Sequence, residues 1–330
     1  MDRVLVTGAS GFLGRLLTQK LIDQGKKVTV FARRSSRLDY FNPKDIHVVH
    51  GDITDRLQLL QATEEIDTVY HLAGLIAYKS SERQKMEKIN VGGTGAVVDA
   101  CITNKVPRLL YLSSVVTIGA SSTPDPVDED FSYNLSKYNL GYFETKREAE
   151  KLVINAVNND GLNAFMINPS TIYGEGDATK GSRKTQVKVA KGRFKLFPPG
   201  GVNVVYVQDV LEAIDLCLLK GIPGRRYIIS GDNLTIQELF AMIADAAGVP
   251  HPHIAIPLGF LKSLGWFGDQ LRKFGYETSL SSETAVTSSL YHWFSNERAK
   301  RELGFKPTPA KKAINESVQW MKSQGLLGDS

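Results

Sequence analysis

Short apolar, β-branched runs alternate with longer amphipathic stretches through the first half of the chain. The runs predict strands at Val4–Thr7, Val28–Ala32, His47–His50, Thr68–Ala73, Arg108–Ser113 and Ala164–Ile167. The stretches between them predict helices at Gly11–Gln24, Asp55–Thr63, Glu82–Thr103 and Tyr142–Asn158. Strand and helix alternating at this spacing predict an α/β fold with a doubly wound parallel sheet. Ligands of such sheets lie at the carboxyl ends of the strands.

The pattern loosens after Pro169. Two further strands are predicted at Val202–Val207 and Arg226–Ser230, and helices at Val210–Leu219, Thr235–Ala247, Ser295–Leu303 and Pro309–Gly325. Thr235 followed by Glu238 is a capping box that marks the start of one of these helices. We therefore expect one domain over residues 1–168 and a smaller α/β lobe over 169–330, with strands and helices near 202–220 returning to the main sheet.

Charge and composition exclude several classes of protein. Lys and Arg number 40 against 35 Asp and Glu, and the net charge of +5 favours anionic ligands without predicting nucleic acid, because no basic block is present. The sequence contains no run of about 18 apolar residues, so no membrane-spanning helix is predicted. The strand pattern begins by Arg3, which leaves no room for a signal peptide. Cys101 and Cys217 lie far apart without metal-ligand spacing, so we expect reduced thiols, no metal site and a cytoplasmic protein.

Three glycines, three residues apart, stand where the first strand passes into a helix, in VLVTGASGFLGRLL at Val4–Leu17. Gly8 would permit a tight turn, Gly11 a close approach of a pyrophosphate to the backbone, and Gly14 close packing of helix on sheet. The start of the helix would offer N–H groups and a positive dipole to the phosphates. A glycine turn can be merely structural, but the flanking strand and helix favour a dinucleotide site in a Rossmann-type domain.

The end of the second strand indicates which dinucleotide binds. An acidic residue there would hold the ribose hydroxyls of NAD, but this chain has Arg33 and Arg34 after Ala32. Guanidinium groups suit a ribose 2′-phosphate, so NADP(H) is favoured over NAD(H). The alternative is that the two arginines belong to a solvated loop.

Tyr142 and Lys146 stand four residues apart at the start of a predicted helix, and therefore on one face of it. A nearby ammonium lowers the pKa of a phenol, which makes it a usable acid or base. Upstream, a buried-type strand ends in Ser113 and Ser114, whose hydroxyls could bond a carbonyl oxygen as charge develops there. Taken alone, each feature is equally compatible with a helix surface or a turn.

Together these motifs resemble the extended short-chain dehydrogenase/reductases of the NAD-dependent epimerase/dehydratase family. The resemblance rests on TGASGFLG, HLAG at His71–Gly74, INVGGTG with Asn90, LSS, YFETK, NPSTIYG, YVQDV and SNERAKRELGFKP, in family order over nearly the whole chain. Within the family, the chain looks closest to the dihydroflavonol 4-reductase-like and hopanoid-associated sugar epimerase-like branch. It is similar, more weakly, to 3β-hydroxysteroid dehydrogenases.

The resemblance implies a role for each matching residue. Tyr142 would be the proton donor or acceptor, Lys146 would hold the nicotinamide ribose, and Ser114, five residues before Gly119, would be the catalytic hydroxyl. Asn90 would keep the catalytic helix in place. The remaining cofactor contacts would be Ser10, Phe12 and Leu13 in the first turn, Asp52 and Ile53 at the adenine, Leu72, Ala73 and Gly74 along the adenosine and pyrophosphate, and Ser113, Pro169, Thr171 and Ile172 at the nicotinamide. Relatives often form homodimers through two helices, here Glu82–Thr103 and Tyr142–Asn158.

Two chemistries share this machinery, namely reduction of a carbonyl by NADPH and epimerisation or dehydration of a nucleotide sugar with tightly bound NAD. Reduction of a hydrophobic ketone or aldehyde is favoured by the arginines, by the apolar run Leu75–Tyr78, and by Val202, where many sugar-nucleotide relatives carry an arginine. A diphosphate could still bind Lys180, Arg183, Lys184, Lys188 or Arg193, although a solvated helix face explains these residues too. A cofactor-binding sensor without catalysis is a third hypothesis, weakened because serine, tyrosine and lysine are all present.

One amphipathic segment, Ile256–Tyr276, is left without a role by these motifs. Its leucines, Trp266 and Phe267 alternate with cations such as Lys262. It could cover an apolar substrate or rest on a membrane surface, but we expect it to pack on the substrate lobe. His251 and His253 precede it in a proline-rich connector that we expect to be a loop.

Overall fold

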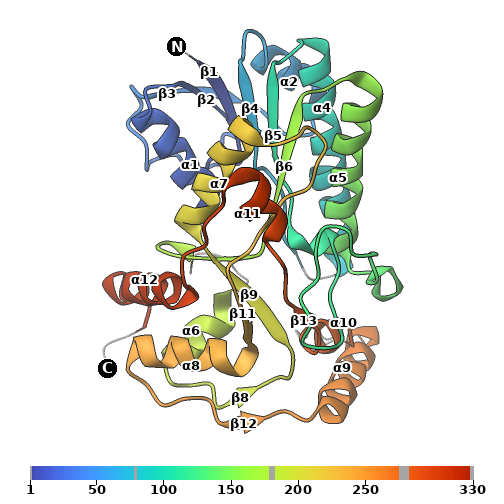
Figure 1. Cartoon of the computed structure of the whole chain (residues 1–330), viewed down its shortest axis with the longest axis vertical. Helices are drawn as coiled ribbons and strands as arrows, with labels where there is room; N and C mark the ends of the chain where they lie inside the picture. Colours follow the sequence, from blue (N-terminus) through green and yellow to red (C-terminus); the bar gives the residue numbers. More distant parts are fainter. Residues whose placement is uncertain (1, 78–79, 178–182, 275–281, 328–330) are drawn as a thin grey trace.

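A seven-stranded parallel sheet fills the upper half of the molecule (Figure 1). The computed structural model describes residues 2–77, 80–177, 183–274 and 282–327. The strand order is β10-β6-β5-β4-β1-β2-β3, and every neighbouring pair is parallel. The strands are β1 (Arg3–Thr7), β2 (Lys27–Ala32), β3 (Ile46–His50), β4 (Thr68–His71), β5 (Arg108–Leu112), β6 (Ala164–Pro169) and β10 (Ile228–Ile229). The predicted doubly wound sheet is confirmed.

Helices cover both faces of this sheet because its strands are apolar on both sides. In β1, Val4 and Val6 join one core cluster while Leu5 joins the other. One face carries α1 (Phe12–Asp23), α7 (Val207–Lys220) and α11 (Glu297–Leu303). The other carries α2 (Arg56–Ala62), α4 (Gly93–Thr103) and α5 (Gly141–Asp160). The chain leaves β1 toward β2 on one side and returns at β4 on the other, which places the ligand crevice at the carboxyl end of β1.

The helix predicted over Glu82–Thr103 is interrupted. After η1 (Ser80–Glu82) it consists of α3 (Arg83–Met86), a π-helical turn η2 (Glu87–Gly92) and then α4. Asn90 lies buried inside the π-turn. Such turns concentrate at functional sites because they change the direction in which a side chain projects.

A second, smaller sheet forms the lower half of the molecule. Its central strand β9 (Gly201–Tyr206) pairs with β11 (Asp232–Thr235), β13 (Tyr291–His292) and β7 (Thr171–Tyr173). The helices around it are α6 (Lys184–Ala190), α8 (Ile236–Ala247) and α12 (Ala310–Ser323). The lower end holds a two-stranded pair, β8 (Leu196–Phe197) with β12 (Ile254–Ala255), and the helices α9 (Leu258–Lys273) and α10 (Ser282–Thr287). Two short 3₁₀ turns, η3 (Val115–Thr117) and η4 (Ser136–Tyr138), precede α5.

The chain near 202–220 divides between the two halves. Helix α7 packs on β6 of the main sheet, whereas β9 belongs to the second sheet. The strand that returns to the main sheet is β10, beside β6. The capping box at the start of α8 is confirmed: Thr235 Oγ1 accepts from Glu238 N at 3.1 Å, and Thr235 N donates to Glu238 Oε2 at 2.7 Å. Among the described residues, no helix has both the length and the apolar character needed to cross a membrane.

Gly14 fixes how closely α1 approaches the end of β1. A Cβ at this position would lie 2.1 Å from the carbonyl oxygen of Gly8, which cannot move without displacing the turn. We expect Gly14→Ala to lower the free energy of unfolding by about 1–3 kcal/mol, as overpacked sites do. Urea unfolding measures this change. The control is Gly259→Ala in α9, where a Cβ meets no atom within 4 Å. Equal stability of the two variants would contradict the expectation.

Candidate active site

Glycines, which have no side chains, occupy the key positions of the turn between β1 and α1. Gly8 has a φ of 81°, and a Cβ there would lie 2.7 Å from the backbone nitrogen of Ala73. Gly11 precedes α1 without a side-chain cap, and a Cβ there would meet only the oxygen of Gly8, at 3.2 Å. Because a helix N-terminus attracts anions, the open space beside Gly11 fits a pyrophosphate. The residues present therefore suit the dinucleotide that the sequence predicts.

The adenosine end of the crevice combines one carboxylate with two cations. Arg33 and Arg34 are exposed after β2, and neither forms an ion pair with any residue that the structure describes. Asp52 follows β3, where hydrogen bonds from the backbone and hydroxyl of Thr54 lower its pKa, helped by the positive charge of Arg33. Arg33 and Asp52 thus lie close enough to interact, at the place expected for ribose and adenine.

A buried chain of hydrogen bonds runs beneath the turn. Thr7 Oγ1 lies 2.7 Å from His71 Nδ1, and His71 Nε2 lies 3.0 Å from Thr94 Oγ1. Thr94 in turn hydrogen-bonds Tyr111, whose ring stacks on His71. Burial, reinforced by the charge of Lys146, lowers the pKa of His71 to about 3, so its ring is neutral at physiological pH. A neutral ring supplies one donor and one acceptor, which the two threonine hydroxyls satisfy.

Lys146 connects this series of hydrogen bonds to helix α5. Its Nζ donates to Tyr111 Oη and to the carbonyl of Leu112, both at 2.8 Å, which ties α5 to the carboxyl end of β5. Burial lowers the pKa of Lys146 to about 7, although the negative charge of Glu150 opposes that shift. Burial also raises the pKa of Tyr111 well above its usual value, so this phenol stays neutral beside the ammonium.

Tyr142 lies one turn before Lys146, in the first turn of α5. Ser114 follows β5 and caps η3, its hydroxyl accepting from Val116 N at 3.4 Å. Val116 and Tyr142 pack in the same apolar cluster. The structure therefore gathers Ser114, Tyr142 and Lys146 around the carboxyl end of β5.

Ser113 differs from its expected role. Its hydroxyl donates to the buried carboxylate of Glu150 instead of facing the crevice. The same carboxylate oxygen accepts from Thr117 Oγ1 at 3.0 Å and from Asn168 Nδ2 at 2.6 Å. Arg226 lies 3.7 Å from its other oxygen. Ser113 thus helps to neutralise a buried charge, and only its backbone remains for the cofactor.

Asn90 reaches α5 from the π-turn. Its Oδ1 accepts from Leu75 N at 2.7 Å, and its Nδ2 donates to Leu75 O at 3.0 Å and to Thr145 Oγ1 at 3.1 Å. Thr145 immediately precedes Lys146. Asn90 therefore connects the segment after HLAG to α5, the helix that carries Tyr142 and Lys146.

Apolar and aromatic side chains surround Tyr142. The cluster contains Ala120, Leu135, Leu140 and Phe143, with Val116, Tyr133, Tyr138, Tyr142 and Leu290 packed against it. Phe143 also meets His292 edge to face, with 6.4 Å between ring centroids. The C-terminal part of the chain thus contributes to the wall beside the catalytic helix. Ile76, in the apolar run after HLAG, is 49% exposed, and Tyr78 lies outside the described residues.

The residues that the resemblance assigns to the nicotinamide lie where β6 passes into β7. Pro169 ends β6, and Thr171 and Ile172 begin β7, which pairs with β9. The carbonyl of Ile172 accepts from Arg183, so it is already engaged. Arg183 is buried 3.5 Å from Asp177 and 4.0 Å from the centre of the Tyr173 ring, which removes it from the cations considered for a diphosphate.

The other cations considered for a diphosphate lie on the surface around α6. Lys184, Lys188 and Arg193 line a groove of about 680 Å³, together with Lys191, Phe194 and others. Lys180 lies outside the described residues.

Sequence reasoning did not find Tyr111, Thr94 and Glu150. A signal for Glu150 was present, because it stands four residues after Lys146 and eight after Tyr142, on the inward face of the same helix. Tyr111 and Thr94 gave no such signal, since a strand tyrosine and a helix threonine are ordinary core residues.

The lowered pKa of Lys146 makes stability depend on pH. Between about 7 and the usual 10.5, the unfolded chain binds a proton that the folded chain does not, so the free energy of unfolding rises with pH. The contribution is at most about 1.4 kcal/mol per pH unit. We expect Lys146→Met to lack this rise, as measured by urea unfolding at several pH values in this range. If the free energy of unfolding rose equally with pH in the variant and the wild type, Lys146 would not be the cause of the rise.

Comparison with known proteins identifies the family. The NAD dependent epimerase/dehydratase family matches residues 4–230. Sterol demethylase protein B of Methylococcus capsulatus is 29% identical, over 98% of this chain and 99% of its own. A 3 beta-hydroxysteroid dehydrogenase/Delta 5-->4-isomerase of Mycobacterium tuberculosis is 31% identical, over 98% of this chain and 91% of its own. The crystal structure of gox2253 superposes with a TM-score of 0.88 at 30% identity, covering 99% of both chains. These matches confirm the resemblance drawn from the motifs: the chain belongs to the NAD dependent epimerase/dehydratase family.

Proposed function

We propose that the protein is an NADP(H)-dependent reductase of an apolar ketone or aldehyde. The observation that carries this proposal is the cluster of apolar and aromatic side chains against which Tyr142 packs, to which Val116 and Leu290 contribute from different parts of the chain. Such a cluster favours a hydrophobic carbonyl compound over a sugar diphosphate. The hydroxysteroid in the name of the Mycobacterium tuberculosis relative supports the same substrate class.

The reaction follows from the positions of three side chains. When bound, the reduced dinucleotide supplies a hydride to the carbonyl carbon. The phenol of Tyr142 gives its proton to the carbonyl oxygen, and the hydroxyl of Ser114 donates a hydrogen bond to that oxygen as negative charge develops. Lys146 would hold the nicotinamide ribose, while Tyr111 and Leu112 fix its position. The carbonyl gains one hydride and one proton, and the product is an alcohol.

Tyr142→Phe tests the proton transfer. We expect turnover of apolar ketones with NADPH to fall by roughly 10²–10⁴-fold, since the variant has no proton to give, while NADPH binding is retained. The matched control is Tyr138→Phe, because Tyr138 packs in the same cluster but does not precede a lysine by four residues. Steady-state kinetics over a panel of cyclic and long-chain ketones measures both. Wild-type turnover by Tyr142→Phe would remove Tyr142 from the mechanism.

We propose NADP(H) as the cofactor because two exposed arginines follow β2 and, although Asp52 lies near Arg33, neither arginine forms a salt bridge with a residue that the structure describes. We expect the double variant Arg33→Ala/Arg34→Ala to bind NADPH roughly tenfold or more weakly, since charged hydrogen bonds to the 2′-phosphate are lost. NADH binding should change by less than about twofold, because NADH has no such phosphate. Fluorescence titration with both dinucleotides measures the difference. Tighter binding of NADH than NADPH by the wild type would overturn the assignment.

One observation favours a second candidate function, the epimerisation or dehydration of a nucleotide sugar. The groove of about 680 Å³ beside α6 is lined by Lys184, Lys188, Lys191 and Arg193, and four cations suit a diphosphate. An epimerase would retain NAD through purification and convert a nucleotide sugar without net consumption of cofactor. Release of bound NAD on denaturation, together with such turnover, would replace the reductase assignment.

The family resemblance also leads us to propose a homodimer through α4 and α5. These helices pack against each other on one face of the main sheet, and Leu152 of α5 is exposed. Light scattering in solution measures the mass directly.

A further inference from the structure

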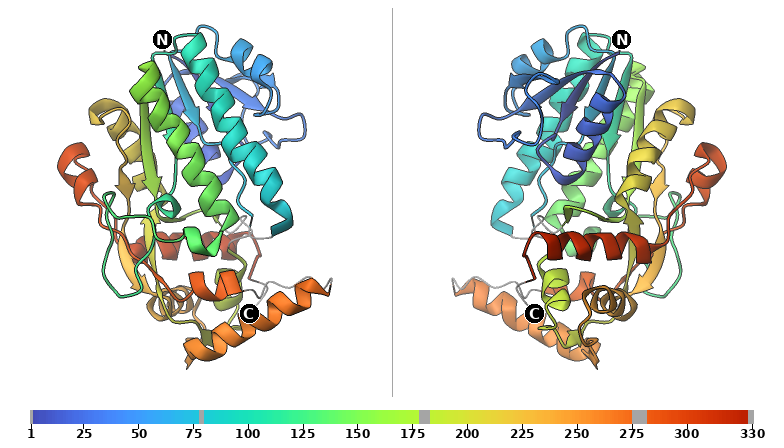
Figure 2. Two further views of the ribbon diagram at one scale, coloured as in Figure 1. Left: turned by 90° about the vertical axis from the view of Figure 1, so that its right-hand side faces the viewer. Right: turned by 90° about the vertical axis from the view of Figure 1, so that its left-hand side faces the viewer.

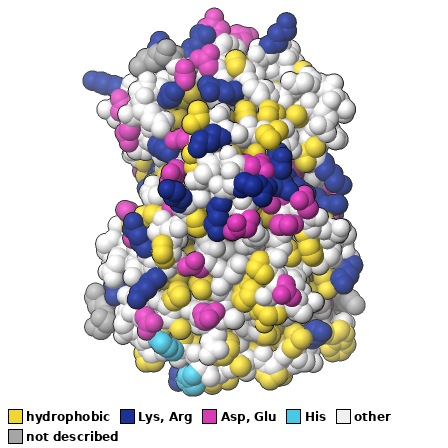
Figure 3. Space-filling model, in the orientation of Figure 1, with side chains coloured by type: hydrophobic (Ala, Val, Ile, Leu, Met, Phe, Trp, Pro, Cys, Tyr) yellow, Lys and Arg dark blue, Asp and Glu magenta, His cyan; other side chains and the backbone are white. Residues whose placement is uncertain are grey.

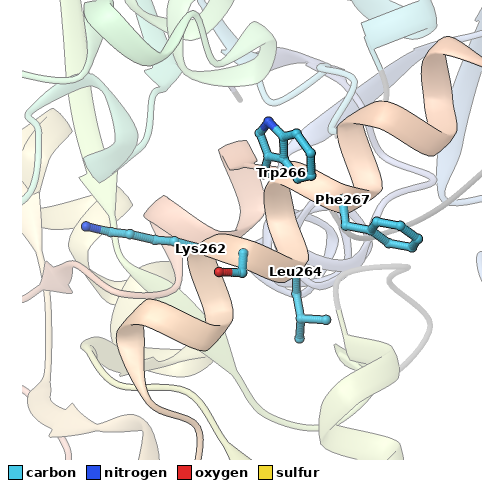
Figure 4. Close-up of a pocket in the computed structure, with 5 residues that line it drawn as sticks. Lys262, Leu264, Trp266 and Phe267 are labelled. Atoms are coloured by element: carbon cyan, nitrogen blue, oxygen red, sulfur yellow. The ribbon is translucent and has the colours of Figure 1, made fainter.

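Helix α9 carries large apolar side chains that the rest of the described chain does not cover. It packs on α10, and Leu261, Gly265 and Gly268 on its inner face are buried. Its outer side presents Phe260 at 59% exposure, Trp266 at 62% and Phe267 at 54%. Figure 4 shows Trp266, Phe267 and Lys262 projecting from the helix in different directions. Together with Ser263 and Leu264 they line a shallow hollow of about 590 Å³.

The apolar surface continues from α9 onto the β8–β12 pair. Leu196 of β8 and Ile254 of β12 are both exposed. The two strands are parallel neighbours, and Ile256 N donates to Phe197 O at 2.9 Å just before α9 begins. Together they form the end of the molecule farthest from the N-terminus, which we call the base (residues 195–197 and 254–267). Figure 2 shows α9 extending past the body of the protein at this end.

The base is formed by two stretches of chain that contain no acidic residue. Neither 178–208 nor 246–268 includes Asp or Glu, although the whole chain has 35 of them. Lys195 and Lys262 are exposed there. The nearest acidic side chains beyond these stretches have partners, since Asp245 pairs with His251 at 2.7 Å and Asp269 accepts from Ser282 N at 3.2 Å. At the lower edge of the view in Figure 3, hydrophobic, basic and histidine side chains are visible.

We propose that the base docks on the surface of a lipid bilayer that contains anionic headgroups. Trp266, Phe260 and Phe267 would enter the boundary between headgroups and acyl chains, where aromatic side chains on amphipathic helices bind. The exposed lysines would lie near the negatively charged headgroups. A Trp and Phe surface on stretches that carry exposed lysines and no acidic residue is complementary to such a membrane in both polarity and charge, and the first carboxylate beyond it in α9, Asp269, already accepts a hydrogen bond from Ser282 N.

A second copy of the chain fits this surface less well. A symmetric dimer places the same patch against itself. Lys195 and Lys262 of both copies would then lie in one interface, and the acid-free stretches 178–208 and 246–268 offer no carboxylate to pair with them. The proposal does not depend on the reductase activity.

Sedimentation of the full chain with vesicles tests the proposal. We expect the protein to sediment with vesicles of equimolar phosphatidylcholine and phosphatidylglycerol, and to bind phosphatidylcholine vesicles much more weakly. The double variant Trp266→Ser/Phe267→Ser should lose roughly tenfold or more of the affinity. The matched control is Leu57→Ser in α2, because Leu57 is 74% exposed at the opposite end of the molecule. This control should bind as the wild type does.

A second measurement separates lost contact from lost folding. Brominated lipids should quench the tryptophan fluorescence of the wild type, and the conservative variant Trp266→Phe should bind vesicles but lose most of that quenching. Three results would overturn the proposal: no sedimentation with anionic vesicles, equal binding by the double variant that retains NADPH binding, or self-association without vesicles that the double variant abolishes.

Discussion

The site depends on one buried ammonium. Lys146 extends from α5 to the carboxyl end of β5, where the phenol of Tyr111 and the carbonyl of Leu112 accept its hydrogen bonds. Burying a charge costs free energy unless partners compensate, so these two acceptors hold the side chain in one place. Because the helix carries Tyr142 one turn earlier and Ser114 follows the same strand, this single anchor fixes the relative positions of the three groups of the proposed site.

The polar groups beneath the site form two networks with separate tasks. Thr7, His71, Thr94 and Tyr111 lead from the glycine turn to Lys146, so the cofactor cradle and the catalytic helix share one hydrogen-bonded support. Glu150, one turn further along α5, collects donors from β5, η3 and β6. Buried hydrogen bonds hold their groups in place, and both networks end on α5, one at Lys146 and the other at Glu150. The buried hydrogen bonds of the core therefore hold the residues of the site in position.

The sequence predicted those parts of the molecule whose physics is local. Backbone geometry and hydrophobic periodicity depend on residues close together in the sequence. They were enough to predict the turn at Gly8 and Gly14, the strands of the main sheet and the capping box at Thr235. Other features depend on side-chain contacts that the local pattern does not encode. Ser113 turns to Glu150, thirty-seven residues away, and Arg183 is buried against Asp177 and Tyr173 although its neighbours are basic. The π-turn around Asn90 was not predicted either, because its six residues are too few for a local change of helical period to be read from the sequence.

Strand β9 has a consequence for how new specificity can arise in this fold. Three other passes of the chain, at β7, β11 and β13, pair with it, so the lower lobe is woven from segments separated by more than a hundred residues. The stretch that spans the lobe, residues 171–323, also contains α7, β10 and α11, which belong to the main sheet and its helices. Recombination that exchanges a shorter stretch of gene would split the small sheet, and exchange of the whole stretch would also replace part of the main domain. A change of preferred substrate is therefore easiest through scattered substitutions that remain compatible with one another.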